Sequence, residues 1–389
     1  MKGNRVLATI VLVAILAGSV LGTACAGAKG QSGPAGVGIQ SIINNGNGTF
    51  TVKLTDGSSF TTDNFTGPQG SKGDTGATGA TGAKGDTGPQ GPQGLPGLGY
   101  SPMQIALLRW YECIQTGSTF NVVGGPVGLC FDGANVWVAN FNGNSVSKLK
   151  ASDGSPVGTY PVGTGPYSVC FDGTNIWTAN WGSDNVTKLR ARDGSLVGTY
   201  AVGSTPASIC FDGANVWVGN LNSNSVSKLK ASDGSLVGTY GVGGGPYFVC
   251  FDGTNIWTAN YGTNNVTKLR ASDGSLAGTY AVGTNPESIC FDGANVWVAN
   301  FGGNSVTKLG ASDGSLVGTY TVGTKPIWIC FDGASIWVTN FGSNSVTKLR
   351  ANDGSLVGTY ATSIGPSGIC FDGANVWVAS TAGDSVMKL

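Results

Sequence analysis

The C-terminal part of the chain repeats with a period of forty residues. One cysteine marks each of seven copies, at Cys130, Cys170, Cys210, Cys250, Cys290, Cys330 and Cys370. Within a copy, short runs of β-branched and aromatic residues alternate with Asp-Gly and Asn-rich sequences, the pattern of strands joined by tight turns. In the fifth copy this pattern predicts four strands, at residues 287–291, 295–299, 305–311 and 316–322.

Four short strands in each unit of forty residues are typical of the blades of a β-propeller. The seventh copy stops at Leu389, after its third strand, and a matching fourth-strand sequence stands before the first copy, at residues 119–123. A strand borrowed from the N-terminal side would close the ring and remove an open sheet edge. We therefore predict an all-β fold over residues 118–389, a seven-bladed β-propeller with four-stranded blades and an N-terminal strand that closes the last blade.

The run Val136-Trp137-Val138-Ala139-Asn140 and its equivalents resemble the hallmark of YVTN/NHL-type propeller repeats. The resemblance implies a fold and leaves function open, because propellers host both binding proteins and enzymes. Streptogramin-inactivating lyases share the seven-bladed form, and the chemistry of that family uses a histidine with a bound divalent metal. Because this chain contains no histidine, we expect that it is not a lyase of that type.

The missing histidine also removes histidine-based nucleophile activation and histidine metal ligands. The 21 basic and 21 acidic residues balance, which argues against a nucleic-acid partner because phosphate binding needs a basic surface. We therefore expect no catalytic residues, no metal and no cofactor, and we expect that the protein is not an enzyme.

Residues 1–28 read as an export signal, with Lys2 and Arg5 before an apolar stretch and small residues after it. Two endings compete. The sequence Leu21-Gly22-Thr23-Ala24-Cys25 resembles a bacterial lipoprotein box, which would place a lipid on Cys25, and Ala24-Cys25-Ala26 also fits ordinary cleavage. An uncleaved anchor is a third interpretation, although the stretch is short for a spanning helix. We expect an exported protein, at the cell surface or extracellular, whose contact with the membrane is a lipid anchor at most.

Residues 67–99 carry glycine at every third position from Gly67 to Gly97. Three polyproline-like chains leave room only for glycine at their common axis, and the segment resembles bacterial collagen-like proteins. The resemblance implies a three-chain stalk and a homotrimer, whereas the alternative interpretation is a flexible linker. On either side we predict a small β-meander at residues 30–66 and a neck helix at residues 100–117, which either trimerises or packs on the propeller.

Two positions vary between copies and lie on the face opposite the repeated Asp-Gly turns. The first follows the Ala-Asn pair that ends the second strand, and the second is the pair after the proline that opens each blade. Aromatic side chains there would bind sugar rings or peptide side chains, although those of the first position could also simply pack between blades. The candidate ligand-binding residues are Tyr167, Trp181, Tyr247, Phe248, Tyr261, Glu287, Lys325 and Trp328.

Two other repeated features have structural interpretations. The repeat cysteines are predicted to be small buried apolar residues, because equivalent positions on neighbouring blades are too far apart for a disulfide and no CxxC spacing indicates zinc. The run Lys148-Leu149-Lys150 and its equivalents are predicted to be solvent-exposed charges.

These observations favour a surface-displayed binding protein that presents an aromatic face to a glycan or protein ligand. Three propellers on one stalk would gain avidity. The alternatives are an extracellular enzyme acting on a polysaccharide or small molecule in the propeller funnel, and a purely structural component of the cell surface.

Overall fold

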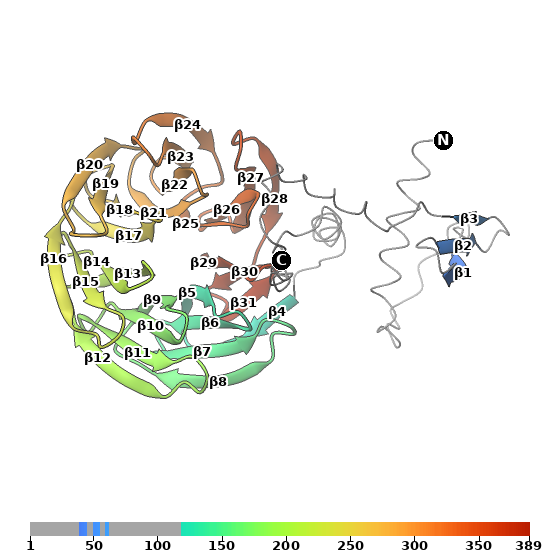
Figure 1. Cartoon of the computed structure of the whole chain (residues 1–389), viewed down its shortest axis with the longest axis horizontal. Coiled ribbons are helices and arrows are strands. Elements are labelled where there is room, and N and C mark those ends of the chain that lie inside the picture. Colours follow the sequence, from blue (N-terminus) through green and yellow to red (C-terminus); the bar gives the residue numbers. More distant parts are fainter. Residues whose placement is uncertain (1–38, 45–49, 55–58, 62–117) are drawn as a thin grey trace, which may run out of the picture. The chain divides into compact units, whose positions relative to one another are not determined.

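The computed structural model describes residues 39–44, 50–54, 59–61 and 118–389 (Figure 1). They belong to two units. In the first, β1 (Ile39–Asn44), β2 (Phe50–Leu54) and β3 (Ser59–Thr61) form an antiparallel sheet in that order, within the segment predicted to be a meander. The export signal with Cys25, the collagen-like segment and the neck helix lie outside the described residues.

The second unit is a seven-bladed propeller, and each blade is an antiparallel sheet of four strands (Figure 1). The strands of each blade are given from the innermost outward. Blade 1 is β5 (Pro126–Phe131), β6 (Asn135–Asn140), β7 (Ser145–Lys150) and β8 (Pro156–Pro161); blade 2 is β9 (Pro166–Phe171), β10 (Asn175–Asn180), β11 (Asn185–Arg190) and β12 (Leu196–Ala201); and blade 3 is β13 (Pro206–Phe211), β14 (Asn215–Asn220), β15 (Ser225–Lys230) and β16 (Leu236–Gly241).

Blade 4 is β17 (Pro246–Phe251), β18 (Asn255–Asn260), β19 (Asn265–Arg270) and β20 (Leu276–Ala281); blade 5 is β21 (Pro286–Phe291), β22 (Asn295–Asn300), β23 (Ser305–Gly310) and β24 (Leu316–Thr321); blade 6 is β25 (Pro326–Phe331), β26 (Ser335–Asn340), β27 (Ser345–Arg350) and β28 (Leu356–Ala361); and blade 7 is β29 (Pro366–Phe371), β30 (Val376–Ser380), β31 (Ser385–Lys388) and β4 (Ser118–Asn121).

The predicted fold is confirmed, including the number of blades. In blade 5 every strand end agrees with the sequence-based expectation within one residue. The part of the chain that the structure describes contains no helix, and hence none that could cross a membrane.

The ring closes in blade 7 as predicted. Strand β4, at Ser118–Asn121 rather than at 119–123, pairs with β31, so that Phe120 stands opposite Val386. The Phe120 ring lies 5.5 Å from the ring of Trp377 and covers Gly154 in the turn of blade 1. Tyrosines of the outer strands occupy the same place in the other blades, so Phe120 completes a circle of aromatic contacts.

The core lies between neighbouring blades and centres on the tryptophan of each second strand. Trp217 is completely buried and packs with Val226 of its own blade and with Val249 and Ile256 of the next. Its Nε1 donates a hydrogen bond to the Asp212 carboxylate at 2.7 Å, and the same tryptophan–aspartate bond recurs in the other six blades. Burial raises the pKa of the Asp212 carboxyl, but the hydrogen bonds it accepts outweigh burial and hold the pKa below its usual range.

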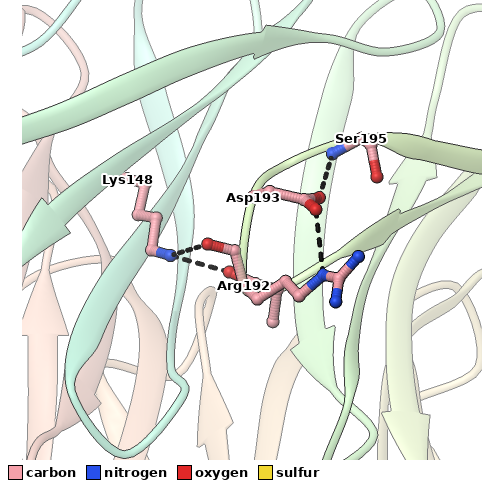
Figure 2. Close-up of polar contacts among 5 residues, drawn as sticks. Lys148, Arg192, Asp193 and Ser195 are labelled. Atoms are coloured by element: carbon pink, nitrogen blue, oxygen red, sulfur yellow. Dashed lines mark hydrogen bonds and ion pairs between the residues drawn. The ribbon is translucent and has the colours of Figure 1, made fainter.

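A lysine on the third strand links each of six blades to the next, and in blades 1 to 5 it is buried. The Lys148 ammonium donates hydrogen bonds to the carbonyl oxygens of Ala191, at 2.7 Å, and Arg192, at 3.4 Å (Figure 2). It also lies 5.0 Å from the centre of the Trp137 ring. Equivalent bonds are made by Lys188, Lys228, Lys268, Lys308 and Lys388.

The prediction that these lysines are solvent-exposed is therefore wrong for the first of each pair. Lys148 is 5% exposed, whereas the prediction is confirmed for Lys150, which is exposed. The Lys148 side chain is long enough to bring its ammonium to two carbonyl groups in the turn of the next blade, and these compensate for its burial.

We expect Lys228→Met to lower the free energy of unfolding by about 1–3 kcal/mol, because the carbonyl groups of Ala271 and Ser272 lose their shared donor. Urea denaturation measures the loss. Lys230→Met, at the exposed end of the same strand, is the control and should change stability by less than about 0.5 kcal/mol. Equal effects of the two substitutions would contradict a role for the buried lysines between blades.

Candidate functional site

The strand register separates the two faces of the propeller. Pro126 pairs with Asn140, and Phe131 pairs with Val136 at the other end of the same two strands. The loops that begin at Phe141 and its equivalents therefore share one side with the blade-opening prolines, here called the loop face. The Asp-Gly turns lie on the opposite side, here called the turn face, as the sequence predicts.

Aromatic rings on the loop face form one connected patch. The hydroxyls of Tyr167 and Tyr247 are 2.9 Å apart and hydrogen-bonded. The centre of the Trp181 ring lies 5.1 Å from that of Tyr167 and 6.0 Å from that of Tyr247. Tyr261 lies 5.9 Å from Tyr247 and 6.2 Å from Phe301. With Phe141, 6.1 Å from Tyr167, these half-buried rings constitute the loop-face aromatic patch.

Trp328 closes the central channel beneath this patch. It is 4% exposed, and its ring centre lies 4.7 Å from that of Phe248 and 6.3 Å from that of Tyr167. A Cβ at Gly128 would lie 3.2 Å from the Trp328 ring, and one at Gly368 would overlap the backbone of the neighbouring blade. The seven equivalent positions are therefore unequal. At Gly128 and Gly368 the backbone of the next blade's inner strand lies too close for a side chain, whereas blade 6 carries a tryptophan there.

Glu287 is a buried carboxyl next to the tyrosine pair. It is 7% exposed, and burial raises its pKa to about 8. Within residues 118–389 the structure gives it no hydrogen-bond or ion-pair partner. The pKa of Tyr247 is raised by burial and then by the neighbouring Glu287, and that of Tyr167 by burial, by Tyr247 and by Glu287. A protonated carboxyl therefore lies near two neutral hydroxyls at neutral pH.

Lys325 lies at the edge of the patch in a left-handed backbone conformation, with φ of 52°. Four of the other copies carry glycine at this position, which adopts positive φ without strain. The remaining two use their side chains to hold the loop: Thr205 accepts a bond from Asn222, and Asn285 donates one to the carbonyl of Tyr261. Lys325 is exposed, and within the propeller its ammonium is placed only over the Phe301 ring, 5.8 Å from its centre.

The structure thus brings four of the predicted residues, Tyr167, Trp181, Tyr247 and Tyr261, into one patch, with Lys325 at its edge. It places Phe248, Glu287 and Trp328 beneath that patch. Sequence reasoning left Phe141 and Phe301 out of the candidate set, although both belong to the aromatic position that follows the second strand. Whether these residues bind a ligand stays a prediction.

The seven repeat cysteines are free thiols, of which six are partly buried and only Cys370 is buried. The prediction that all seven are buried is therefore confirmed for Cys370 alone. In the described part of the chain no group of three or more cysteine or acidic side chains is arranged to hold a metal ion.

Fold and site define a seven-bladed β-propeller with an aromatic loop face. No family model matches the chain, and no curated protein matches it. Its structure is similar to that of a streptogramin B lyase, with a TM-score of 0.62, 22% identity, and coverage of 70% of this chain and 96% of the lyase. It is also similar to a catalytically inactive histidine-to-alanine variant of virginiamycin B lyase from Staphylococcus aureus with quinupristin, with a TM-score of 0.61, 21% identity, and coverage of 70% and 98%. Hydrazine synthase of Kuenenia stuttgartiensis gives a TM-score of 0.60 at 18% identity, with coverage of 71% and 98%. At these identities the likeness shows the fold alone.

The comparisons contradict the prediction that the protein is not an enzyme. Two of the similar structures are lyases on the same scaffold, so the fold gives no support to that prediction. The absence of histidine excludes reactions that need a histidine side chain, but it does not exclude catalysis by other residues. Glu287 was predicted to bind a ligand and not to act as an acid, because the sequence alone does not show that this carboxyl is buried with its pKa raised to about 8.

Proposed function

We propose that the protein is exported and displayed at the cell surface, where the loop-face aromatic patch binds a glycan. The observation that carries the proposal is the unbroken series of ring contacts from Phe141 to Phe301, which spans several blades of one face. Half-buried rings of this kind offer a rigid, partly apolar surface to the faces of sugar rings. The export signal and the collagen-like stalk predicted from the sequence support display away from the cell.

Lys325 favours an acidic sugar. Its ammonium lies at the edge of the patch, beside Phe301, and no carboxylate of the described residues neutralises it. A side chain in a left-handed conformation costs on the order of 1 kcal/mol relative to glycine, so this lysine is retained against a local conformational cost. A uronate or similar carboxylate could pair with it while the sugar ring lies on the aromatic surface.

A glycan array followed by titration calorimetry on the full chain tests the proposal. Trp181→Ala should weaken binding of the best ligand about thirtyfold, as for a central aromatic residue of an interface. Lys325→Gly should weaken binding of acidic ligands about fivefold, the scale of a partly exposed ion pair, without loss of stability. Leu196→Ala, on the exposed outer strand of the same blade as Trp181, is the control and should leave affinity unchanged. An array on which no glycan binds would contradict the proposal and favour a structural role. Binding of a peptide on a peptide array would mean that the ligand of the patch is a protein and not a glycan.

The collagen-like segment would convert weak sites into avid ones. We expect the full chain to sediment as a trimer and a chain without residues 67–99 to sediment as a monomer. A monomer in both cases would remove the stalk from the proposal and leave the binding site standing.

Glu287 favours a second candidate, an enzyme acting on a polysaccharide or small molecule at the same face. A carboxyl with a pKa of about 8 is protonated at neutral pH and can donate a proton to a leaving group. Incubation of acidic polysaccharides with the full chain should then release fragments, and Glu287→Gln should abolish the release. Fragment release that persists in Glu287→Gln would exclude this carboxyl as the acid.

A further inference from the structure

The channel has a second compartment, which opens away from the aromatic patch. A cavity of about 520 Å³ lies between the second halves of the seven inner strands. All seven blades line it, and Trp328 and Phe248 separate it from the loop face. In blades 2 to 6 the Cys-Phe pair that ends the inner strand lines the walls, as at Cys250 and Phe251, whereas blades 1 and 7 contribute only Leu129 and Ile369.

Equal side chains around a ring explain why the cavity is unfilled. On the loop face the equivalent positions differ, so one large residue can occupy the axis. At the Cys-Phe level the residues are the same in each copy, and none of them reaches across the ring. The cavity is open to solvent, and its volume lies in the range of roughly 300–1,000 Å³ that is common for pockets that bind small molecules.

The side chains of the lining are uncharged and mostly apolar. It consists of phenylalanine, tryptophan, aliphatic and cysteine side chains, with Ser168 as the one hydroxyl, and contains no acidic or basic residue. Burial raises the pKa of the repeat cysteines, as at Cys250, with smaller contributions from a neighbouring thiol and from Asp252. The thiols therefore stay protonated at neutral pH and do not serve as anionic metal ligands. A charged ligand would lose its hydration without compensation.

We propose that this cavity binds one uncharged, mainly apolar small molecule of aromatic or polycyclic character. Six or more aromatic rings around the wall favour flat, polarisable ligands over chains. Trp328 at the inner end limits the depth to which the molecule enters. This site is independent of the loop-face patch and of the glycan proposed there.

The neutral fluorophore N-phenyl-1-naphthylamine is a suitable probe, added to the full chain at pH 7. We expect saturable binding of one probe per propeller, with emission sensitised by tryptophan. Trp328→Phe should reduce the sensitised emission more than Trp181→Phe, which lies on the loop face. Leu236→Ser, on the outer strand of blade 3, where Leu236 is 57% exposed, controls for adsorption of the probe to the outer surface. It should change neither the affinity for the probe nor the sensitised emission.

A matched pair of triple variants tests the location. Replacing Cys170, Cys250 and Cys330 by methionine adds volume to the wall, whereas alanine at the same positions keeps the cavity open. We expect the methionine variant to bind the probe at least about tenfold more weakly, and the alanine variant to bind within about threefold of the natural chain. Circular dichroism confirms folding, and if the methionine variant does not fold, the two tryptophan variants decide. Absence of saturable binding, equal affinity of both triple variants, or equal loss of sensitised emission in both tryptophan variants would overturn the proposal.

Discussion

Deleting residues 118–121 should lower the free energy of unfolding of the propeller by on the order of 5 kcal/mol, which we expect to be the largest effect of any short change in this chain. The deletion removes the ladder between β4 and β31 and exposes an edge in blade 7. It also withdraws the half-buried Phe120 ring from Trp377. Loss of a fully buried aromatic ring costs about 3–5 kcal/mol, and the half-buried Phe120 contributes a part of that.

Urea and thermal unfolding of the full chain with and without these four residues measure the effect. Phe120→Ala separates the contribution of the ring from that of the strand. Ser118→Ala with Thr119→Ala changes two exposed residues of the same strand and should leave the midpoint unchanged. If the deletion and this control unfolded alike, closure through β4 would contribute nothing to stability.

The second large effect is a loss of stability between about pH 5 and pH 8, caused by Glu287. In the unfolded chain its carboxyl has a pKa near the ordinary value of 4.5, whereas in the fold the pKa is about 8. Between these values the folded protein keeps a proton that the unfolded chain has released. Stability is therefore highest at the acid end and falls by about 1.4 kcal/mol per pH unit as the pH rises through the window.

The chain is well suited to this measurement, because it has no histidine to titrate in the same range. The hydrogen-bonded carboxyls such as Asp132 have lowered pKa values and act only at more acid pH. Denaturation at pH 5.0, 6.5 and 8.0 should give the slope in the natural chain and a flat profile in Glu287→Gln. A natural chain as stable at pH 8.0 as at pH 5.0 would show that Glu287 is not buried as a neutral acid.

The fold could be predicted from the sequence because the repeat carries several independent signals. The period, the Asp-Gly turns and the incomplete seventh copy led to the same closed ring, and in blade 5, where strand ends were predicted, the structure agrees within one residue. The buried lysines were missed because a Lys-x-Lys run has the same composition at a surface. Lys148 and Lys150 are two residues apart and project from the same side of β7. Lys148, opposite Trp137 in the middle of the strand, is buried against the next blade, whereas Lys150, opposite Asn135 at the end of the strand, is exposed.

The candidate site could be predicted in part. Variation between copies drew attention to Tyr167, Tyr247 and Trp328, and the structure places them near one another. The same variation also has a packing cause, since seven side chains that meet at one axis cannot all be alike. No sequence feature predicts the cavity between the inner strands. It arises because the Cys-Phe side chains are identical in each copy and none of them is long enough to fill the centre of the ring.

The unequal division of the axis has a consequence for how such a chain can change through recombination. At the rim the blades are nearly interchangeable, so exchange or duplication of a copy would meet no barrier there. At the centre each blade has its own neighbour to fit: a side chain in place of Gly128 would meet the backbone of blade 2 and the Trp328 ring, and one in place of Gly368 would overlap the backbone of blade 1. The order of the copies is thus constrained only at the inner strands. A chain with its copies in another order would fail to pack there and would not fold.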